Sequence, residues 1–321
     1  MGEWLESLVP PGTEFLVWLQ SFGAGWLEAI FRLFTILGNE EFYLFLLPVV
    51  YWCVSRRAGI GLAYVSMLSV WVNSTVKHLF DVPRPADARL RVRWPETSPS
   101  FPSGHSQSAV TNWGYLALQL RRRLWTIVAI LLMLMISLSR MFLGVHFPQD
   151  LVGGWVIGLA VLFLFFWAAP RVEPWLVRQP AGLQAALAVA LPLVLIFLHP
   201  ADTEGLYPAE GALTPASALI GMGLGLIMER AWVRFDVGGS LGRRLARLVL
   251  GLVIVVAVYA GPKLLLPAEM PYSAEAVARI LRYVLLGWVT AFVCPWLFVK
   301  LGLAPRESEP AGAYRVVTSS L

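Results

Sequence analysis

Apolar residues dominate nine stretches of the chain, and short polar connections separate them. A helix that crosses a bilayer needs about 20 mainly apolar residues, and the first stretch reaches that length only with its flanks. The pattern predicts an all-α integral membrane protein with about nine transmembrane helices, at 42–54, 58–79, 105–120, 124–143, 151–169, 181–198, 213–229, 245–266 and 278–301.

Residues 1–38 follow a different pattern, because tryptophans alternate with charged and polar residues at roughly helical intervals. Pro10-Pro11 and the glycines near residue 24 interrupt the segment. We expect amphipathic helices that lie on the membrane interface. A tenth span at 15–37 is the alternative, but Glu28 and Arg32 would make it costly.

Basic residues mark every second connection between the predicted spans. The positive-inside rule assigns such connections to the cytoplasm. The loops 199–212 and 267–276 contain no Lys or Arg, so we place them outside. The N-terminus is then outside and the C-terminus is cytoplasmic, with a polar, flexible tail at 305–321. The basic set comprises Arg56, Arg57, Arg121, Arg122, Arg123, Arg171, Arg178, Arg230, Arg234, Arg243, Arg244, Arg247, Lys300, Arg306 and Arg315.

One segment on the outer side departs from the positive-inside rule. Residues 77–93 carry Lys77, Arg84, Arg89, Arg91 and Arg93. A positive cluster retained against the rule indicates an anionic ligand. A solvated loop is the alternative, and it accounts for the last three arginines through the counter-charges Asp81, Asp87 and Glu96.

Composition supports the membrane assignment and excludes other classes. The chain is 58% hydrophobic and 14% charged, whereas soluble domains average about 25% charged residues. The net charge of +5 is spread singly between apolar runs, so we expect no nucleic-acid partner. Cys53 and Cys294 lie inside apolar runs without metal-ligand spacing, so each is expected to behave as a small buried hydrophobic residue. The small-residue run 221–226 predicts close helix packing.

The stretch 139–150, SRMFLGVHFPQD, is a short polar interruption between two apolar runs. Arg140 offers a planar fork of donors that fits phosphate oxygens, and His146 is a candidate nucleophile near neutral pH. Pro148 suits the first turn of a helix, which would put Asp150 within one turn of His146, where it can orient the imidazole. An interfacial loop without chemistry explains the same residues equally well.

Three segments predicted on the outer side together resemble the type 2 phosphatidic acid phosphatase superfamily. They are KHLFDVPRP at 77–85, PSGH at 102–105 and the stretch 139–150. The superfamily has three motifs. The first is Lys followed after six residues by Arg-Pro, and the second is Pro-Ser-Gly-His. The third is Ser-Arg, five residues, His, three residues and Asp, and the three segments match all of them. The resemblance covers about 42–169. The nine-span layout looks most like the glucose-6-phosphatase branch, which is a likeness of architecture and does not determine the substrate.

The resemblance implies a role for each matched residue. His146 attacks phosphorus, Asp150 orients it, and His105 protonates the leaving oxygen and then activates water. Lys77, Arg84, Ser103, Gly104 and Arg140 bind the phosphate, and no metal and no cofactor are expected. The physical chemistry agrees, because Ser103 and Gly104 begin a helix whose backbone amides favour an anion, and three cations can replace a metal ion.

These observations predict a metal-independent membrane phosphatase acting on a phosphorylated lipid, such as phosphatidic acid or a polyprenyl diphosphate, at the outer face. A soluble sugar phosphate, a phosphotransferase and a binding or transport module are the alternatives. The predicted units are interfacial helices at 1–38, a phosphatase core at 39–170, further transmembrane helices at 171–304 and the tail. Arginine greatly outnumbers lysine, which favours a prokaryotic plasma membrane with the site facing the periplasm or exterior. The sequence leaves the oligomeric state undetermined.

Overall fold

The computed structural model describes residues 2–23, 25–200, 210–265, 267 and 271–307. Regular structure in these residues is helical, which confirms the all-α prediction, and one isolated bridge joins Phe235 to Arg306. The helices are α1 (Gly2–Ser7), α2 (Val9–Ser21), α3 (Gly25–Ile36), α4 (Glu40–Val49), η1 (Val50–Val54), α5 (Arg56–Phe80), α6 (Gly104–Leu120), α7 (Arg123–Phe142), α8 (Pro148–Val177), α9 (Ala181–Leu198), α10 (Glu210–Met228), η2 (Glu229–Val233), α11 (Leu241–Leu265), α12 (Tyr272–Trp288), η3 (Val289–Val293) and α13 (Cys294–Lys300).

Each predicted span coincides with a helix or a continuous run of helices. In the described part of the chain, 7 helices are long and apolar enough to cross a membrane. Helix α3 and the continuous run of α4 and η1 are bent by 54° relative to each other, and they make an eighth span if they count as one. Helix α6, with 17 residues, is shorter than these seven helices. The protein is therefore a multi-pass membrane protein, while the count of nine and the orientation stay predictions.

The boundaries predicted from sequence differ in detail from the helices. A continuous span at 15–37 does not form, because α2 ends at Ser21 and α3 begins at Gly25. The division expected near residue 170 falls inside α8, which runs on to Val177. Most of the predicted tail, 308–321, lies outside the described residues.

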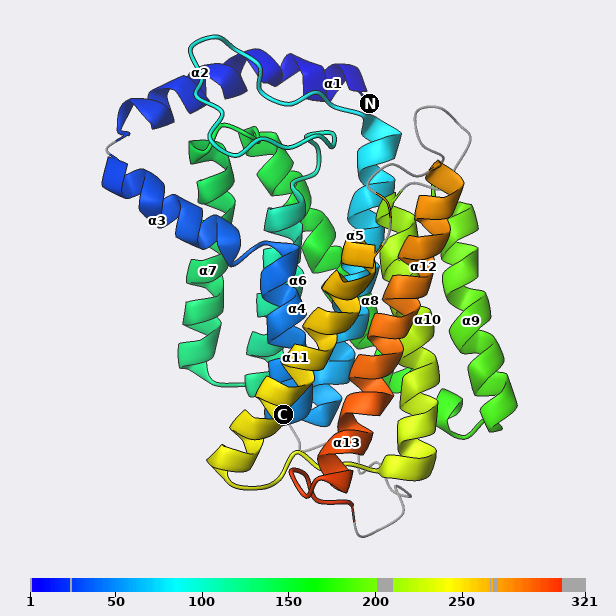
Figure 1. Ribbon diagram of the computed structural model, residues 1–321. Helices are drawn as coiled ribbons and strands as arrows, with labels where there is room; N and C mark the ends of the chain where they lie inside the picture. Colours follow the sequence, from blue (N-terminus) through cyan, green and yellow to red (C-terminus); the bar gives the residue numbers. More distant parts are fainter. Residues whose placement is uncertain (1, 24, 201–209, 266, 268–270, 308–321) are drawn as a thin grey trace.

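The N-terminal helices lie across one end of the bundle (Figure 1). On α2, Leu16 is fully buried and packs with Phe147 and Leu151 at the start of α8. Trp18 on α2 and Phe22, which follows its last residue, are exposed. Helix α2 therefore packs an apolar side chain against the body of the protein and exposes others, and its location on the membrane interface stays a prediction.

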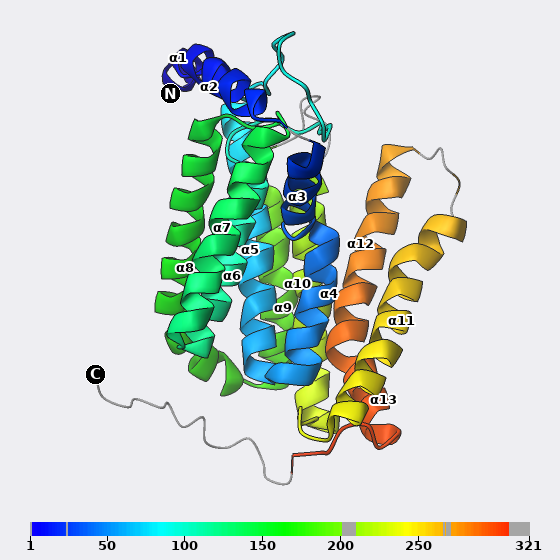
Figure 2. The ribbon, with the colours of Figure 1, turned by 90° about the vertical axis from the view of Figure 1, so that its left-hand side faces the viewer.

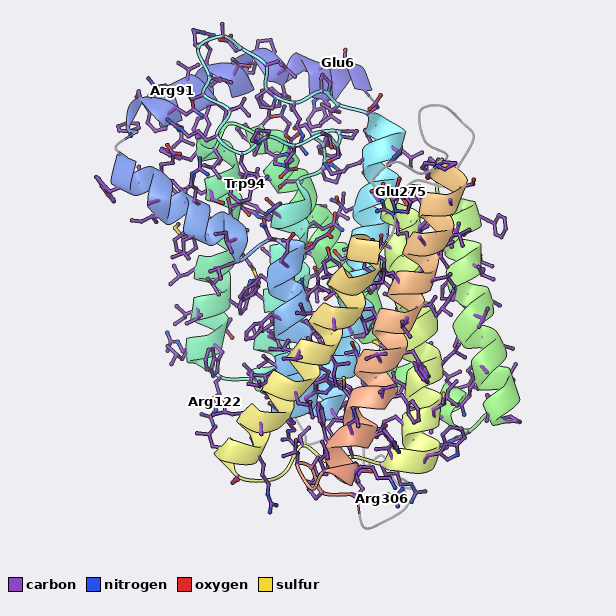
Figure 3. All side chains as sticks on the ribbon, viewed as in Figure 1. Glu6, Arg91, Trp94, Arg122, Glu275 and Arg306 are labelled. Atoms are coloured by element: carbon purple, nitrogen blue, oxygen red, sulfur yellow. The ribbon has the colours of Figure 1, made fainter. Side chains whose placement is uncertain are left out.

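The three motif segments meet at this same end. Helices α5 and α7 end there, and α6 and α8 begin there (Figure 1). Figure 3 shows Arg91 and Trp94 in the loop that covers this end, whereas Arg122 and Arg306 lie at the opposite end. Alternating helix directions therefore bring together residues that are far apart in sequence.

Glycines hold α6 and α8 close together near the site. A Cβ atom on Gly154 would lie 2.7 Å from the Ser103 carbonyl oxygen, and one on Gly158 would lie 2.9 Å from Val110 Cβ. The Ser103 amide donates to the Asp150 carbonyl oxygen at 2.9 Å. Because no side chain separates the two backbones, the beginnings of α6 and α8 have a fixed relative position.

Helices α9 to α13 pack on one side of the first eight helices, mainly through contacts of α10 with α5 (Figure 2). Helices α10 and α12 approach so closely that a Cβ atom on Gly221 would lie 1.9 Å from the Val284 carbonyl oxygen. Gly287 and Gly225 are similarly confined. Close packing at the run 221–226 is confirmed.

Candidate active site

The turn between α7 and α8 positions His146 beside Asp150. Pro148 is the first residue of α8, so the carboxylate of Asp150, two residues later, turns back over the helix N-terminus. Its Oδ2 accepts from the Phe147 amide at 2.8 Å and from the Ser100 hydroxyl at 2.5 Å, and it lies 3.3 Å from His146 Nδ1. The spacing of four residues thus produces the predicted pair.

The hydrogen bonds of His146 define which ring nitrogen can react. Its Nε2 lies 3.2 Å from Arg84 Nη1, and a guanidinium can only donate. Nε2 must therefore carry the lone pair, and the proton must lie on Nδ1, facing Asp150. Burial lowers the pKa of His146 well below 6.5, and the charges of Arg84, Lys77, Arg140 and His105 act in the same direction.

Two arginines from different segments share one carboxylate. Arg84, in the loop after α5, contacts Glu96 Oε2 at 2.8 Å, and Arg140, in the last turn of α7, pairs with Glu96 Oε1. Arg140 is fully buried, and its Nε has no hydrogen-bond partner among the described residues. Burial lowers the pKa of Arg84 to about 10, whereas the charge of Asp150 opposes that shift. Glu96 therefore neutralises two cations at the position predicted to bind phosphate.

The loop between α5 and α6 is held in place by cationic side chains. Lys77, buried in the last turn of α5, donates to the carbonyl oxygens of Pro99 and Ser100. Arg84 Nη1 also donates to the Val145 carbonyl oxygen at 2.8 Å, in the turn that carries His146. Lys77 and Arg84 thus fix the backbone around the histidine as well as contributing positive charge.

The N-terminus of α6 carries the second motif. Gly104 is its first residue, and the Ser103 hydroxyl caps the helix by accepting from the Ser106 amide at 3.3 Å. The Ser103 amide is bonded to Asp150, so it is already engaged within the protein, although its predicted role is to bind phosphate. His105 extends from this first turn.

His105 is positioned by residues that the sequence did not single out. Its Nε2 lies 2.9 Å from Asn39 Oδ1, at the start of α4. A Cβ atom on Gly38 would lie 2.8 Å from His105 Cδ2. The bend between α3 and α4 therefore passes directly over the ring, and only glycine leaves room for it there.

The structure brings the predicted residues to one end of the bundle but divides the basic cluster of 77–93. Arg89 pairs with Asp87 and Glu14, and Arg93 pairs with Glu28. The counter-charge expected from Glu96 goes instead to Arg84 and Arg140. Arg89 is therefore explained by the solvated-loop alternative through Asp87, whereas Arg93 is 11% exposed and pairs with Glu28, which that alternative did not name. Lys77 and Arg84 contact the backbone around His146.

Glu96, Ser100, Asn39 and Gly38 were missed as site residues. Each lies in a loop or at a bend, where no hydrophobic periodicity applies. Glu96 and Ser100 could have been found from one signal, because a loop that links two motifs of one site must pass over that site.

A cavity of about 740 Å³ opens directly from the site. Lys77, Glu96, Gly104 and His105 line its outer end. The rest is lined mainly by apolar side chains from α4, α5, α10 and α12, with polar residues such as Asn73 and Asn112 among them. The site therefore adjoins an apolar space within the bundle.

The fold and the site together define a multi-pass helical membrane protein with a buried, cation-rich site around two histidines. Residues 58–174 match the model of the PAP2 superfamily, and residues 213–306 match that of the PAP2 superfamily phosphatase, transmembrane extension. The chain contains a PAP2 superfamily domain followed by this extension, which confirms the resemblance found in the motifs.

Individual proteins are similar to parts of the chain. The chain is 26% identical over 223 residues to the "Probable sphingosine-1-phosphate phosphatase" of Dictyostelium discoideum, covering 63% of this chain and 54% of that protein. It is 29% identical over 200 residues to human glucose-6-phosphatase 3, covering 54% of this chain and 56% of that protein. It therefore spans about half the length of these relatives. A solved PAP2 type phosphatidylglycerolphosphate phosphatase from Bacillus subtilis is similar with a TM-score of 0.45 and 24% identity, over 52% of this chain and 87% of that one.

Proposed function

We propose that this protein is a membrane phosphatase that hydrolyses a lipid phosphate ester at the outer face, without a metal, through a phosphohistidine on His146. One observation carries the proposal. The lone pair of His146 Nε2 faces a cationic site, while Nδ1–H faces Asp150. This is the arrangement that a histidine nucleophile needs, because Asp150 stabilises the positive charge that develops on the ring.

In the first step, His146 Nε2 attacks phosphorus and the bond from phosphorus to the ester oxygen breaks. The leaving oxygen takes a proton from His105. Charge on the remaining phosphate oxygens is stabilised by Lys77, Arg84 and Arg140. These three side chains come from α5, the following loop and α7. If the substrate is a diphosphate, the broken bond is the phosphoanhydride.

In the second step, neutral His105 takes a proton from water, and the resulting hydroxide attacks the phosphorus of phosphohistidine. The phosphorus–nitrogen bond breaks, phosphate leaves, and His146 returns to its neutral form. The contact of His105 with Asn39 orients the ring for both proton transfers. A lipid or sugar hydroxyl in place of water would give a phosphotransferase, and product analysis with a labelled donor separates the two reactions.

The apolar cavity beside the site supports a lipid substrate, because a headgroup at His105 would have its hydrocarbon next to apolar side chains. The similarity to the "Probable sphingosine-1-phosphate phosphatase" of Dictyostelium discoideum agrees with this choice. The human relative, a glucose-6-phosphatase, favours a soluble sugar phosphate as the second candidate. Loop charges support an outer-facing site, and the excess of arginine over lysine supports a prokaryotic plasma membrane.

Phosphate release by the purified protein in detergent tests the proposal. We expect His146→Ala to lose activity at least about a thousandfold, because the covalent route disappears. The matched control is His199→Ala, since His199 is also buried but contacts Ser74 and Pro200 instead of the site. Helix content of both variants, measured by circular dichroism, shows that they fold.

Three results would each contradict a part of the proposal. Retention of activity in His146→Ala would remove the phosphohistidine mechanism. Lipid phosphate binding without turnover in the wild type would favour a binding or transport module. Faster turnover of glucose 6-phosphate than of lipid phosphates would favour the soluble substrate.

A further inference from the structure

The cavity beside the site lies between two parts of the chain. One wall comes from α4, α5 and α6, and the other comes from α10, α12 and η3, which belong to the transmembrane extension. Lys77, Gly104 and His105 line its outer end, where the phosphate group is proposed to bind. The space is thus continuous with the catalytic residues.

The cavity extends deep into the bundle. Its lining includes Lys77 near the end of α5 and Gly59 near the beginning of the same helix. These residues are 18 positions apart (77 − 59), which is roughly 27 Å at 1.5 Å per residue. Hydrocarbon layers are about 30 Å thick. Apolar side chains dominate the deep part, including Leu44, Leu47, Ile60, Val70, Met222 and Leu226.

The wall on the extension side has a fixed position. Gly221 and Gly287 allow the backbones of α10 and α12 to touch, so the two helices form one rigid unit. At the inner end, the Tyr51 hydroxyl donates to the Ala291 carbonyl oxygen at 3.2 Å, and Trp52 Nε1 donates to the Thr290 carbonyl oxygen at 3.1 Å. These bonds join the two walls and set the size of the cavity.

The volume of the cavity limits what it can hold. A methylene group occupies about as much space as a water molecule in the liquid, roughly 30 Å³, so a chain of about 18 carbons fills roughly 540 Å³ and two such chains roughly 1,100 Å³. The cavity of about 740 Å³ is larger than one such chain and smaller than two.

We propose that α10 and α12 form, with α4 and α5, a binding site for the hydrocarbon chain of a lipid phosphate that has one chain. This inference rests on the proposed function, because the headgroup must sit at His146. The extension then acts as the determinant of substrate selectivity. A sphingoid phosphate and a lysophosphatidate share the required chemistry, namely a phosphate monoester and one long chain.

The experiment compares phosphate release from four probes by the full-length protein in detergent. The probes are an 18-carbon sphingoid 1-phosphate, an 18-carbon lysophosphatidate, a phosphatidate with two 18-carbon chains, and an 8-carbon lysophosphatidate. We expect kcat/KM for the two long single-chain probes to exceed that for each other probe at least about tenfold, which equals about 1.4 kcal/mol. The ratio between the first two probes distinguishes a sphingoid from a glycerol backbone.

The variant Ala63→Phe tests the depth of the site. Ala63 lines the cavity, 14 positions (77 − 63) or roughly 21 Å along α5 from Lys77. A phenyl ring there shortens the space, so kcat/KM for the 18-carbon probes should fall about tenfold while that for the 8-carbon probe stays unchanged. The matched control is Ala160→Phe, on the exposed side of α8, which should change neither value.

The outcomes separate this inference from the proposed function. If no probe releases phosphate, the proposed function fails and this inference falls with it. If the two-chain phosphatidate is hydrolysed as fast as the single-chain probes, the inference alone is overturned. Equal effects of Ala63→Phe on long and short chains would also overturn it. The comparison of probes on the wild type needs no variant and therefore stands even if Ala63→Phe does not fold.

Discussion

Glu96 lies between Arg84 and Arg140, where the substrate phosphate is proposed to bind. Its two oxygens contact both guanidinium groups, so a bound phosphate competes with this carboxylate for the same donors. In Glu96→Gln, the amide keeps the shape of the side chain but loses its negative charge and one acceptor. The competition should weaken, and anions should bind more tightly.

The burial of the three side chains sets the size of the effect. Their exposed fractions are 22% for Glu96, 14% for Arg84 and 0% for Arg140. Exposed ion pairs contribute about 0.2–1 kcal/mol, and hydrogen bonds to charged groups about 1.5–3 kcal/mol. For a partly exposed carboxylate we take a contribution between these two ranges, about 1.4 kcal/mol. This free energy corresponds to a tenfold change in a dissociation constant. We therefore expect Glu96→Gln to lower the inhibition constant of orthovanadate, a phosphate mimic, about tenfold.

The assay is inhibition of lipid phosphate hydrolysis by orthovanadate at constant ionic strength. Glu28→Gln is the matched control, because Glu28 pairs with Arg32 and Arg93 at the same end of the protein but outside the site. It makes the same change in net charge and should leave the inhibition constant within about twofold, as expected for a screened, distant charge. Weaker inhibition of Glu96→Gln, or equal effects of both variants, would refute the competitor role.

Two further predictions concern the histidines. The pKa of His146 is lowered in the folded protein, so below pH 6.5 the unfolded chain binds a proton that the folded chain does not. The free energy of unfolding therefore decreases as the pH is lowered, by up to about 1.4 kcal/mol per pH unit. The thermal midpoint in detergent should thus drop more between pH 7 and 5 for the wild type than for His146→Gln; equal drops would contradict the lowered pKa. Gly38→Ala should displace His105 and reduce kcat at least about tenfold. Gly25→Ala, where a Cβ meets nothing within 4 Å, should keep wild-type activity; an active Gly38→Ala would contradict the contact.

The elements that sequence reasoning predicted are those governed by local patterns. Apolar runs located the membrane helices, since a backbone in lipid must satisfy its own hydrogen bonds. The pairing of His146 with Asp150 followed from a spacing of four residues at a helix start, where Pro148 marks the first turn. Both features depend on a few consecutive residues, so they can be derived without coordinates.

The remaining features depend on contacts between distant segments. Glu96 could be assigned as a counter-charge, but which arginines it neutralises depends on how the loop 81–103 folds over α7. The contact of Asn39 with His105 depends on the bend between α3 and α4. The cavity depends on the distance between α10 and α5, which the small-residue run 221–226 does not define.

A structure of the protein with orthovanadate tests the central claim most directly. The account predicts vanadium bonded to His146 Nε2, with its oxygens contacting Lys77, Arg84 and Arg140, His105 on the opposite side, and Glu96 displaced. Vanadate bound away from His146, or between the arginines with His105 out of reach, would contradict the convergence of two imidazoles and three cations on one phosphate.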